Sequence, residues 1–285
     1  MKNINQPLVS VLVCTYNAEK YIATTLQSIT RQTYNNLQIL VLDNNSSDNT
    51  CNVVRKIDDK RIQLIDSKDN LGPYKGFNFL LDNHARGKYV AVQDHDDLWH
   101  TEKIALQVDF LEKNADFVGC GSQTIEYFEA FEAFYLKKRK PIDVVTTHIA
   151  LLFRNEKKYR YDTEFQFEAD HYFMKFVLCE EQPKIYSIQK LLALHRRRSD
   201  NANLNTKWFK GFSWRHIQRH YKVTGSLKGT IMFSFNRLFV PDAILMPLKL
   251  KMYDFQPLTN MKNDDFLKVF YDFLVVGDNT NNGTK

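Results

Sequence analysis

Apolar and amphipathic segments alternate along the first half of the chain. The runs at 8–14 and 37–42 are almost wholly apolar, which is typical of strands buried on both faces of a parallel sheet. Between them, apolar residues such as Ile22 and Ile29 recur at helical spacing, and Asn17 is the expected N-cap of that helix. The chain is therefore expected to open with a strand, a helix and a second strand.

The same alternation continues toward the middle of the chain. Because helices that connect parallel strands cross over with a right hand, it predicts an α/β fold with a doubly wound, mostly parallel sheet. Further along, the pattern is less regular and favours one more helix and one more strand. The expected ranges are 48–57, 74–84, 102–113 and 170–179 for helices, and 61–66, 89–93, 117–121 and 189–195 for strands.

Polar clusters follow directly after three of the expected strands. They read TYN at 15–17, DNNSSDNT at 43–50 and QDHDD at 93–97. The carboxyl ends of parallel strands meet at one edge of a sheet, and open α/β sheets bind their ligands there. We therefore expect these clusters to form one site.

The last third of the chain differs from the rest in charge. The net charge is +6, but residues 1–195 hold 24 Lys+Arg and 26 Asp+Glu, whereas 196–262 hold 13 and 3. Aromatic residues are interleaved with the basic ones, without a motif that reads a nucleic-acid groove, so nucleic acid is not an expected partner. The pattern favours a helix lying on an anionic membrane surface, with a packing subdomain of basic exterior as the alternative.

No apolar stretch reaches the roughly 18 residues of a membrane-spanning helix. Pro241 and Pro247 break the apolar residues of the last third, whereas 265–276 repeats them at helical spacing and predicts an amphipathic helix. The apolar run near the N-terminus is too short for a signal peptide. The expected location is the cytoplasm, with the inner face of the membrane as the alternative.

The four cysteines are expected to be reduced thiols in the core. They lie far apart inside apolar stretches, with no CxxC pair and no histidine at the spacing of zinc ligands. Reduced thiols are typical of a cytosolic protein. The residues are Cys14, Cys51, Cys120 and Cys179.

Asp94, Asp96 and Asp97 place three carboxylates within four positions, directly after an expected strand. Such a cluster suffers like-charge repulsion unless a cation offsets it. Mg²⁺ and Mn²⁺ take carboxylate oxygens and share coordination with a substrate diphosphate. A metal site is one interpretation, and an acidic turn in which Asp97 caps the following helix is the other.

The opening VSVLVCTYNAEKYIATTLQSITRQTYNNLQILVLDNNSSDNT, followed by NLGPYKGFN at 70–78 and by QDHDDLW, resembles the inverting family 2 glycosyltransferases with the GT-A fold. Each motif is weak singly, but their order and spacing are specific. The resemblance implies a nucleotide-sugar glycosyltransferase domain at 1–200. The remainder, 201–285, is expected to be a helical, basic and aromatic C-terminal extension that contacts a membrane or a partner.

By this resemblance, Thr15, Tyr16, Asn17 and Asp43 hold the base and ribose of the nucleotide. Tyr16 can stack on the base, and Asp43 can accept hydrogen bonds from it or from the ribose. An ordinary strand-end aromatic and a capping turn are the structural alternatives. Asn44 stands where the family usually has a second aspartate, so no role can rest on a carboxylate at that position.

The resemblance also places Asn70, Gly72 and Asn78 in a loop beside the nucleotide sugar, although Gly72 also suits a plain turn. Asp94 is expected at the ribose and the metal, and Asp96 at the metal, which would be Mn²⁺ or Mg²⁺. The sequence therefore predicts a metal-dependent donor site.

Asp170 aligns with the family's catalytic base, although the acidic pair is spread out here and Glu168 is the fallback. A positioned carboxylate suits removal of the acceptor proton, and a helix cap is the structural alternative. Further on, His195 and Arg198 stand at the tyrosine and histidine positions of the family's YRxHxxN segment. Arg196 or Arg198 can neutralise charge on the leaving diphosphate, with a solvated basic face as the alternative.

The expected activity is transfer of a sugar from a nucleoside-diphosphate sugar to an acceptor hydroxyl with inversion, as the resemblance implies. The acceptor would be a surface glycan, lipid-linked or polysaccharide. A non-catalytic scaffold for glycan assembly is the alternative. A sugar-nucleotide pyrophosphorylase is disfavoured because CTYNAEK lacks the glycine-rich loop of that class.

Overall fold

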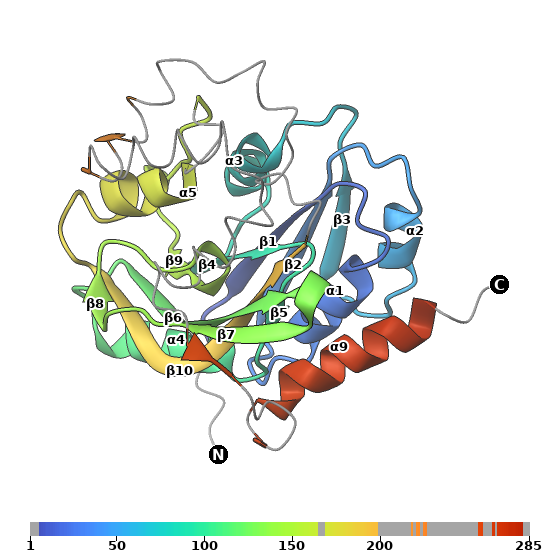
Figure 1. Cartoon of the computed structure of the whole chain (residues 1–285). Coiled ribbons are helices and arrows are strands. Elements are labelled where there is room, and N and C mark those ends of the chain that lie inside the picture. The colour runs from blue at the N-terminus through green and yellow to red at the C-terminus, as the bar shows by residue number, and fades with distance from the viewer. Residues whose placement is uncertain are drawn as a thin grey trace.

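A computed structural model describes residues 6–164, 169–198, 218, 221–222, 225–226, 256–258, 264–265 and 267–281. Within these ranges the strands form one mixed sheet with helices on both faces (Figure 1). The strands are β1 (Val9–Thr15), β2 (Leu37–Asp43), β3 (Ile62–Asp66), β4 (Tyr89–Asp94), β5 (Leu98–Trp99), β6 (Gly119–Phe128), β7 (Ala133–Lys137), β8 (Ile142–Asp143), β9 (Leu152–Arg154), β10 (Ile185–Arg197) and β11 (Gln256–Pro257).

The helices vary in length and regularity. Three short turns interrupt the described chain besides the α-helices, and one of them, η3, is π-helical and continues α5. The α-helices are α1 (Ile22–Thr30), α2 (Thr50–Arg55), α3 (Pro73–Asn83), α4 (Lys103–Lys113), α5 (Ala169–Tyr172) and α9 (Lys268–Asn281), and the turns are η1 (Glu129–Phe131), η2 (His148–Ala150) and η3 (Phe173–Leu178).

The sheet has a parallel half and a mixed half. Strands β3, β2, β1 and β4 lie side by side and are all parallel, as the alternation predicts. Beyond β4 the order continues through β9, β6, β7 and β11, and these pairs are antiparallel. Strand β10 pairs in parallel with β6 and antiparallel with β5 and β8. The predicted α/β fold is confirmed, whereas the antiparallel strands are additions to the expectation.

Alternate residues of the parallel strands pack on opposite faces of the sheet. Val11 and Ile39 face the layer formed by α1, α2 and α4, and Leu12 and Leu40 face the layer formed by α3 and the α5–η3 segment. Both sets are fully buried. The two apolar faces explain why β1 and β2 are continuously apolar.

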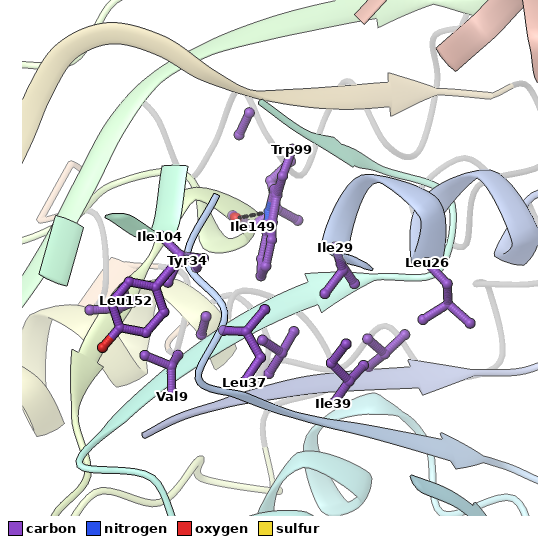
Figure 2. Close-up of a cluster of buried hydrophobic side chains, with 14 of the residues drawn as sticks. Val9, Leu26, Ile29, Tyr34, Leu37, Ile39, Trp99, Ile104, Ile149 and Leu152 are labelled. Atoms are coloured by element: carbon purple, nitrogen blue, oxygen red, sulfur yellow. Dashed lines mark hydrogen bonds between the residues drawn. The ribbon is translucent and has the colours of Figure 1, made fainter. Parts of the chain in front are cut away.

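Trp99 lies at the centre of the first of these layers (Figure 2). Its indole N–H donates to the backbone oxygen of Ile149 at 2.8 Å. Lys103 is fully buried beside it, with Nζ 4.0 Å from the indole ring and a 2.9 Å hydrogen bond to Gln107 Oε1. Burial lowers the pKa of Lys103 from 10.5 to about 7, because the charged amine is cut off from water.

The helices up to α5 begin within two residues of their expected positions, except the first. The first helix begins at Ile22 rather than after Asn17, because Asn17 adopts a left-handed backbone with φ of 48° and lies in the loop before the helix. The helix expected from Glu102 begins at Lys103. Strand β6 continues beyond its expected end and β10 is longer at both ends, since the two strands pair with each other along their length.

Helix α9 covers the mixed half of the sheet. Its buried Phe270 and Phe273 pack with Leu98, Ile125 and Leu194 of the strands, and it lies along α1 (Figure 1). The helix overlaps the amphipathic segment expected at 265–276. Most of the basic and aromatic stretch before it lies outside the described residues.

All four cysteines are free. Cys14, Cys120 and Cys179 are buried as expected. Cys51 is only half-buried, with Sγ 3.7 Å from Asp66 Oδ1, so it is not a core thiol.

Replacing Lys103 with Met is expected to flatten the pH dependence of stability. The unfolded chain holds the lysine proton up to about pH 10.5, whereas the folded protein releases it above about pH 7. Between these values the free energy of unfolding of the wild type gains up to about 1.4 kcal/mol per pH unit from this group. Urea titrations at pH 7, 8 and 9 measure the slope.

The matched control is Lys113→Met, at the end of the same helix, where the side chain is exposed. This variant keeps the wild-type slope. Equal slopes in Lys103→Met and Lys113→Met would contradict the interpretation.

Candidate active site

The ends of β1, β2 and β4 bring the three polar clusters together. Thr15 pairs with Asp43 on one side of β1, and Cys14 pairs with Asp94 on the other. The backbone N–H of Asn44 donates to Thr15 O at 2.8 Å, which extends the pairing beyond the strands. The clusters thus share one edge of the sheet, as the sequence predicts.

The loops after β1 and β2 are bonded to each other. Asp43 is buried, and its carboxylate accepts hydrogen bonds from the backbone N–H and the hydroxyl of Ser46 at 2.9 and 2.6 Å. Asn17 N–H donates to Ser46 Oγ, and Asn17 Oδ1 accepts from Ser47 N–H, each at 2.9 Å. Tyr16, between these anchored residues, is 45% exposed. A fixed loop with an exposed aromatic ring suits stacking on a flat ligand.

The loop before α3 is also fixed by asparagines. Gly72 has a φ of 73°, which favours glycine, and its N–H donates to Asn70 Oδ1 at 2.9 Å. Asn78 donates to the backbone oxygen of Tyr161 and accepts from its N–H, both at 2.8 Å. Both ends of the Asn78 amide are therefore engaged in joining α3 to the segment before α5.

The buried carboxylates at the end of β4 repel one another. Burial, together with the charges of Asp96 and Asp170, raises the pKa of Asp94 to about 7. Burial and the two neighbouring carboxylates also raise the pKa of Asp97. Asp170 lies far along the chain, so its effect on Asp94 indicates that the two side chains are close in space.

Asp97 does not cap the following helix. That helix has Glu102 at its N-cap, and Asp97 Oδ1 instead accepts the backbone N–H of Arg196 at 2.7 Å. The bond joins the acidic segment to the end of β10. The prediction that Asp97 caps the following helix is therefore wrong, because β10 runs beside Asp97 and supplies the N–H group that it binds.

Two arginines at the end of β10 face the acidic segment. Arg198 Nε lies 2.9 Å from Asp96 Oδ2, and Arg196 Nε donates to the backbone oxygen of Asp96 at 3.1 Å. Both guanidinium groups stack on the ring of Tyr21, at 5.0 Å for Arg196 and 4.7 Å for Arg198. The Tyr21 hydroxyl donates to Glu129, which also lies 3.4 Å from Arg196. The alternative that Arg196 and Arg198 form a solvated basic face is therefore wrong.

Tyr21 and Glu129 were not expected at the site. Tyr21 precedes the first helical residue, and Glu129 lies in the turn η1 after β6. Tyr21 lies in the opening segment that resembles the family, but no role was expected for it or for Glu129; the return of β10 to β6 brings the arginines to them.

Asp170 lies in the first turn of α5. Burial alone would raise its pKa, but His171, His148 and backbone N–H groups hold the pKa below its usual value. His171 Nδ1 is 3.8 Å from Asp170 Oδ1. The carboxylate is therefore ionised at neutral pH and can accept a proton. Glu168, the fallback, lies outside the described residues.

The donor set beside β4 suits a metal ion that is shared with a substrate. The described residues contain no group of three or more His, Cys, Asp or Glu side chains arranged to hold a metal. Mg²⁺ needs only one or two carboxylates when phosphates supply the other ligands. The repulsion that raises the pKa of Asp94 favours a cation here, and Arg198 offsets part of it at Asp96.

A comparison with protein families gives a match over residues 10–181 to the profile of glycosyl transferase family 2. The chain belongs to this family. The matched range contains the polar clusters after β1, β2 and β4 and also Asp170. It ends before β10, so Arg196 and Arg198 lie outside it.

Curated relatives of this family 2 chain include a UDP-Glc:alpha-D-GlcNAc-diphosphoundecaprenol beta-1,3-glucosyltransferase, WfaP, of Escherichia coli. The two proteins are 36% identical over 119 residues, which is 42% of this chain and 47% of WfaP. An uncharacterized glycosyltransferase of Haemophilus influenzae is 44% identical over 120 residues, 41% of this chain and 37% of that protein. The chain thus matches less than half the length of these curated relatives.

A solved structure supports the fold over nearly the whole chain. The mannosyltransferase PcManGT from Pyrobaculum calidifontis, solved with GDP-Man and Mn²⁺, has a TM-score of 0.58 at 15% identity, and the match covers 98% of this chain and 88% of PcManGT. At this identity the likeness shows the fold alone, and it confirms the GT-A type expected for this family 2 chain.

Removing the Asp97 carboxylate is expected to destabilise the protein more than neutralising it. Asp97→Ala leaves the Arg196 N–H without its acceptor, which costs about 1–3 kcal/mol. Asp97→Asn keeps an acceptor oxygen and removes a buried charge, so the free energy of unfolding falls less in this variant. Urea unfolding of both variants measures the difference. Equal losses would show that the hydrogen bond to Arg196 contributes little.

Proposed function

We propose that this family 2 protein transfers a sugar from a nucleoside-diphosphate sugar to an acceptor hydroxyl with inversion at the anomeric carbon. The proposed role is in the synthesis of a surface glycan or polysaccharide. Asp94 and Asp96 at the end of β4, and Asp170 from a distant part of the chain, lie near enough for the charges of Asp96 and Asp170 to act on Asp94, and this arrangement supports the proposal.

The donor would bind across the ends of β1, β2 and β4. Tyr16 stacks on the base, and Asp43, together with the loop of Thr15 and Asn17, holds the base and ribose. Asn70 and Gly72 shape the loop that passes the sugar, and Asn78 fixes it from behind. Solved neighbours carry UDP-GlcNAc or GDP-Man, so a nucleoside-diphosphate sugar is the donor class that we propose here.

Asp94 and Asp96 would hold Mn²⁺ or Mg²⁺ together with the donor diphosphate. When bound, the ion supplies positive charge to the diphosphate oxygens. Arg196 and Arg198 add positive charge at the same place, since both contact Asp96. Guanidinium groups suit phosphate oxygens because their donors lie in one plane.

Asp170 would act as the base. The acceptor oxygen attacks the anomeric carbon from the side opposite the diphosphate, and its proton moves to the Asp170 carboxylate. The bond between the anomeric carbon and the diphosphate oxygen breaks, and the diphosphate leaves with the electron pair. Direct displacement of this kind inverts the anomeric centre.

The acceptor is proposed to be a glycan or a lipid-linked sugar. WfaP and a second E. coli relative, WfgD, are named for a diphosphoundecaprenol acceptor. The structure describes no helix that is both long and apolar enough to cross a membrane. We place the protein in the cytoplasm, in peripheral contact with the inner face of the membrane through its basic C-terminal region. Failure to float with anionic vesicles at low salt would argue against this contact.

Variants of Asp96 and Asp170 are expected to separate donor binding from chemistry. A panel of nucleoside diphosphates and nucleotide sugars, with and without Mn²⁺, should include one that raises the melting temperature of the wild type in a metal-dependent way. Asp96→Ala loses this shift. Asp170→Asn retains it, while its rate of sugar transfer falls by about 10²–10⁴-fold.

Each variant is the control for the other, because both remove one carboxylate from the same site. A metal-dependent shift that survives Asp96→Ala would remove Asp96 from the metal site. Undiminished transfer by Asp170→Asn would remove Asp170 as the base. A wild type that responds to no nucleotide would contradict the proposed function as a whole.

A further inference from the structure

A group of charged side chains lies on the mixed half of the sheet, outside the proposed donor site. Glu126 of β6 is fully buried, and three basic residues surround its carboxylate. Arg197 Nε donates to Glu126 Oε2 at 2.5 Å. Lys137 Nζ and His195 Nδ1 each lie 3.4 Å from a Glu126 oxygen. We call these four residues the Glu126 cluster.

Strand register places the cluster on a single face of the sheet. His195 of β10 pairs with Glu126 of β6, so His195 and Arg197, two residues apart, share the face of Glu126. Lys137 of β7 pairs with Thr124, two residues before Glu126, and so has the same orientation. Arg196 and Arg198 point to the other face, toward Asp96.

The cluster holds more positive than negative charge. Burial lowers the pKa of Lys137 to about 8 and also lowers that of His195, so Lys137 is still protonated at neutral pH. Burial would raise the pKa of Glu126, but Arg197, Lys137 and His195 hold it well below its usual value. One carboxylate therefore faces two cations. A buried ion pair that served stability alone would need only one cation, since each further buried charge costs desolvation.

The two cations of the cluster are partly exposed to solvent, and they have N–H groups that can donate further hydrogen bonds. The side chains of Lys137 and Arg197 are each 28% exposed, whereas Glu126 beneath them is not exposed at all. Among the described residues, Glu126 is the hydrogen-bonding or ion-pairing partner of both. Arg197 uses only Nε, so its other guanidinium N–H groups can bind an anion.

Charge interactions link the cluster both to the proposed metal site and to the proposed base. The charge of Arg197 acts on Asp94 and Asp97. Arg139, which follows β7, is half-buried, and its pKa responds first to burial and then to the charges of Glu126, Asp143 and Asp170. The charge of an anion bound to the cluster would therefore act on both sites, as is expected of a group on an acceptor whose hydroxyl faces Asp170.

We propose that Lys137 and Arg197, held by buried Glu126 and supported by Arg139, bind a phosphate group of the acceptor. The acceptor class is a sugar or polyol that carries a phosphate or diphosphate next to the hydroxyl that is glycosylated. The inference rests on the proposed function, because it assigns the acceptor side of the same site. A lipid diphosphate and a polyol phosphate polymer are two sources of this group.

The test is a binding titration of the enzyme saturated with Mn²⁺ and with the nucleoside diphosphate that stabilises it, so that the donor site is filled. The probes are geranyl diphosphate, for the lipid source, and a short poly(glycerol phosphate), for the polymer source. We expect at least one probe to bind the wild type. Lys137→Met weakens that binding by about tenfold or more, as loss of a charged hydrogen bond does, and Lys137→Arg restores most of it.

Lys138→Met is the matched control, because it removes the same charge from the neighbouring exposed residue. It leaves probe binding unchanged. Arg139→Gln is a second variant that spares the direct ion pairs of Glu126, and it carries the test if Lys137→Met does not fold. It too should weaken probe binding.

The outcomes separate this inference from the proposed function. Binding of one probe only identifies the source of the phosphate. A wild type that binds nucleotide but neither probe overturns the phosphate subsite and leaves the proposed function intact. Equal losses in Lys137→Met and Lys138→Met overturn it as well. A loss of nucleotide affinity in Lys137→Met as large as the loss of probe affinity would assign the cluster to the donor.

Discussion

The hydrogen bond from the Arg196 N–H to Asp97 is the contact on which the arrangement of the site depends. It joins the acidic segment after β4 to the end of a strand that lies 99 positions further along the chain. Without it, the guanidinium groups of Arg196 and Arg198 would not be held at Asp96. The repulsion among the three aspartates would then be offset mainly by an incoming cation. The fold thus supplies part of the positive charge that this segment requires.

Strand β10 serves two faces because its side chains alternate. Arg196 and Arg198 face the acidic segment and Tyr21, whereas His195 and Arg197 face Glu126. A strand that paired one residue out of register would exchange these sets and bring Arg197 to the aspartates. The pairing of Arg196 with Tyr127 and of His195 with Glu126 therefore decides which charges meet.

The sequence predicts the parallel half of the fold well and the mixed half poorly. A continuous apolar run such as that of β1 predicts a strand buried on both faces, and in the structure both of its faces do pack against helices. Strands β7 and β9 are short or only partly apolar, and their pairing depends on partners distant in the chain. The same limit applies to the site. Asp94 and Asp96 lie at the end of a strand that could be located from the sequence, whereas Tyr21 and Glu129 join the arginines through tertiary contacts that no local pattern encodes.

The two halves of the site carry opposite charge, and this division follows from their different architecture. Parallel strands end together at one edge, so side chains in their following loops converge, and here those side chains are carboxylates that suit a cation. In the mixed half, neighbouring strands instead present side chains along a shared face, where Lys137 and Arg197 flank one buried carboxylate. A face of this kind favours an anion. A substrate pair in which the donor brings a metal and the acceptor brings a phosphate would complement both halves without a change in the fold.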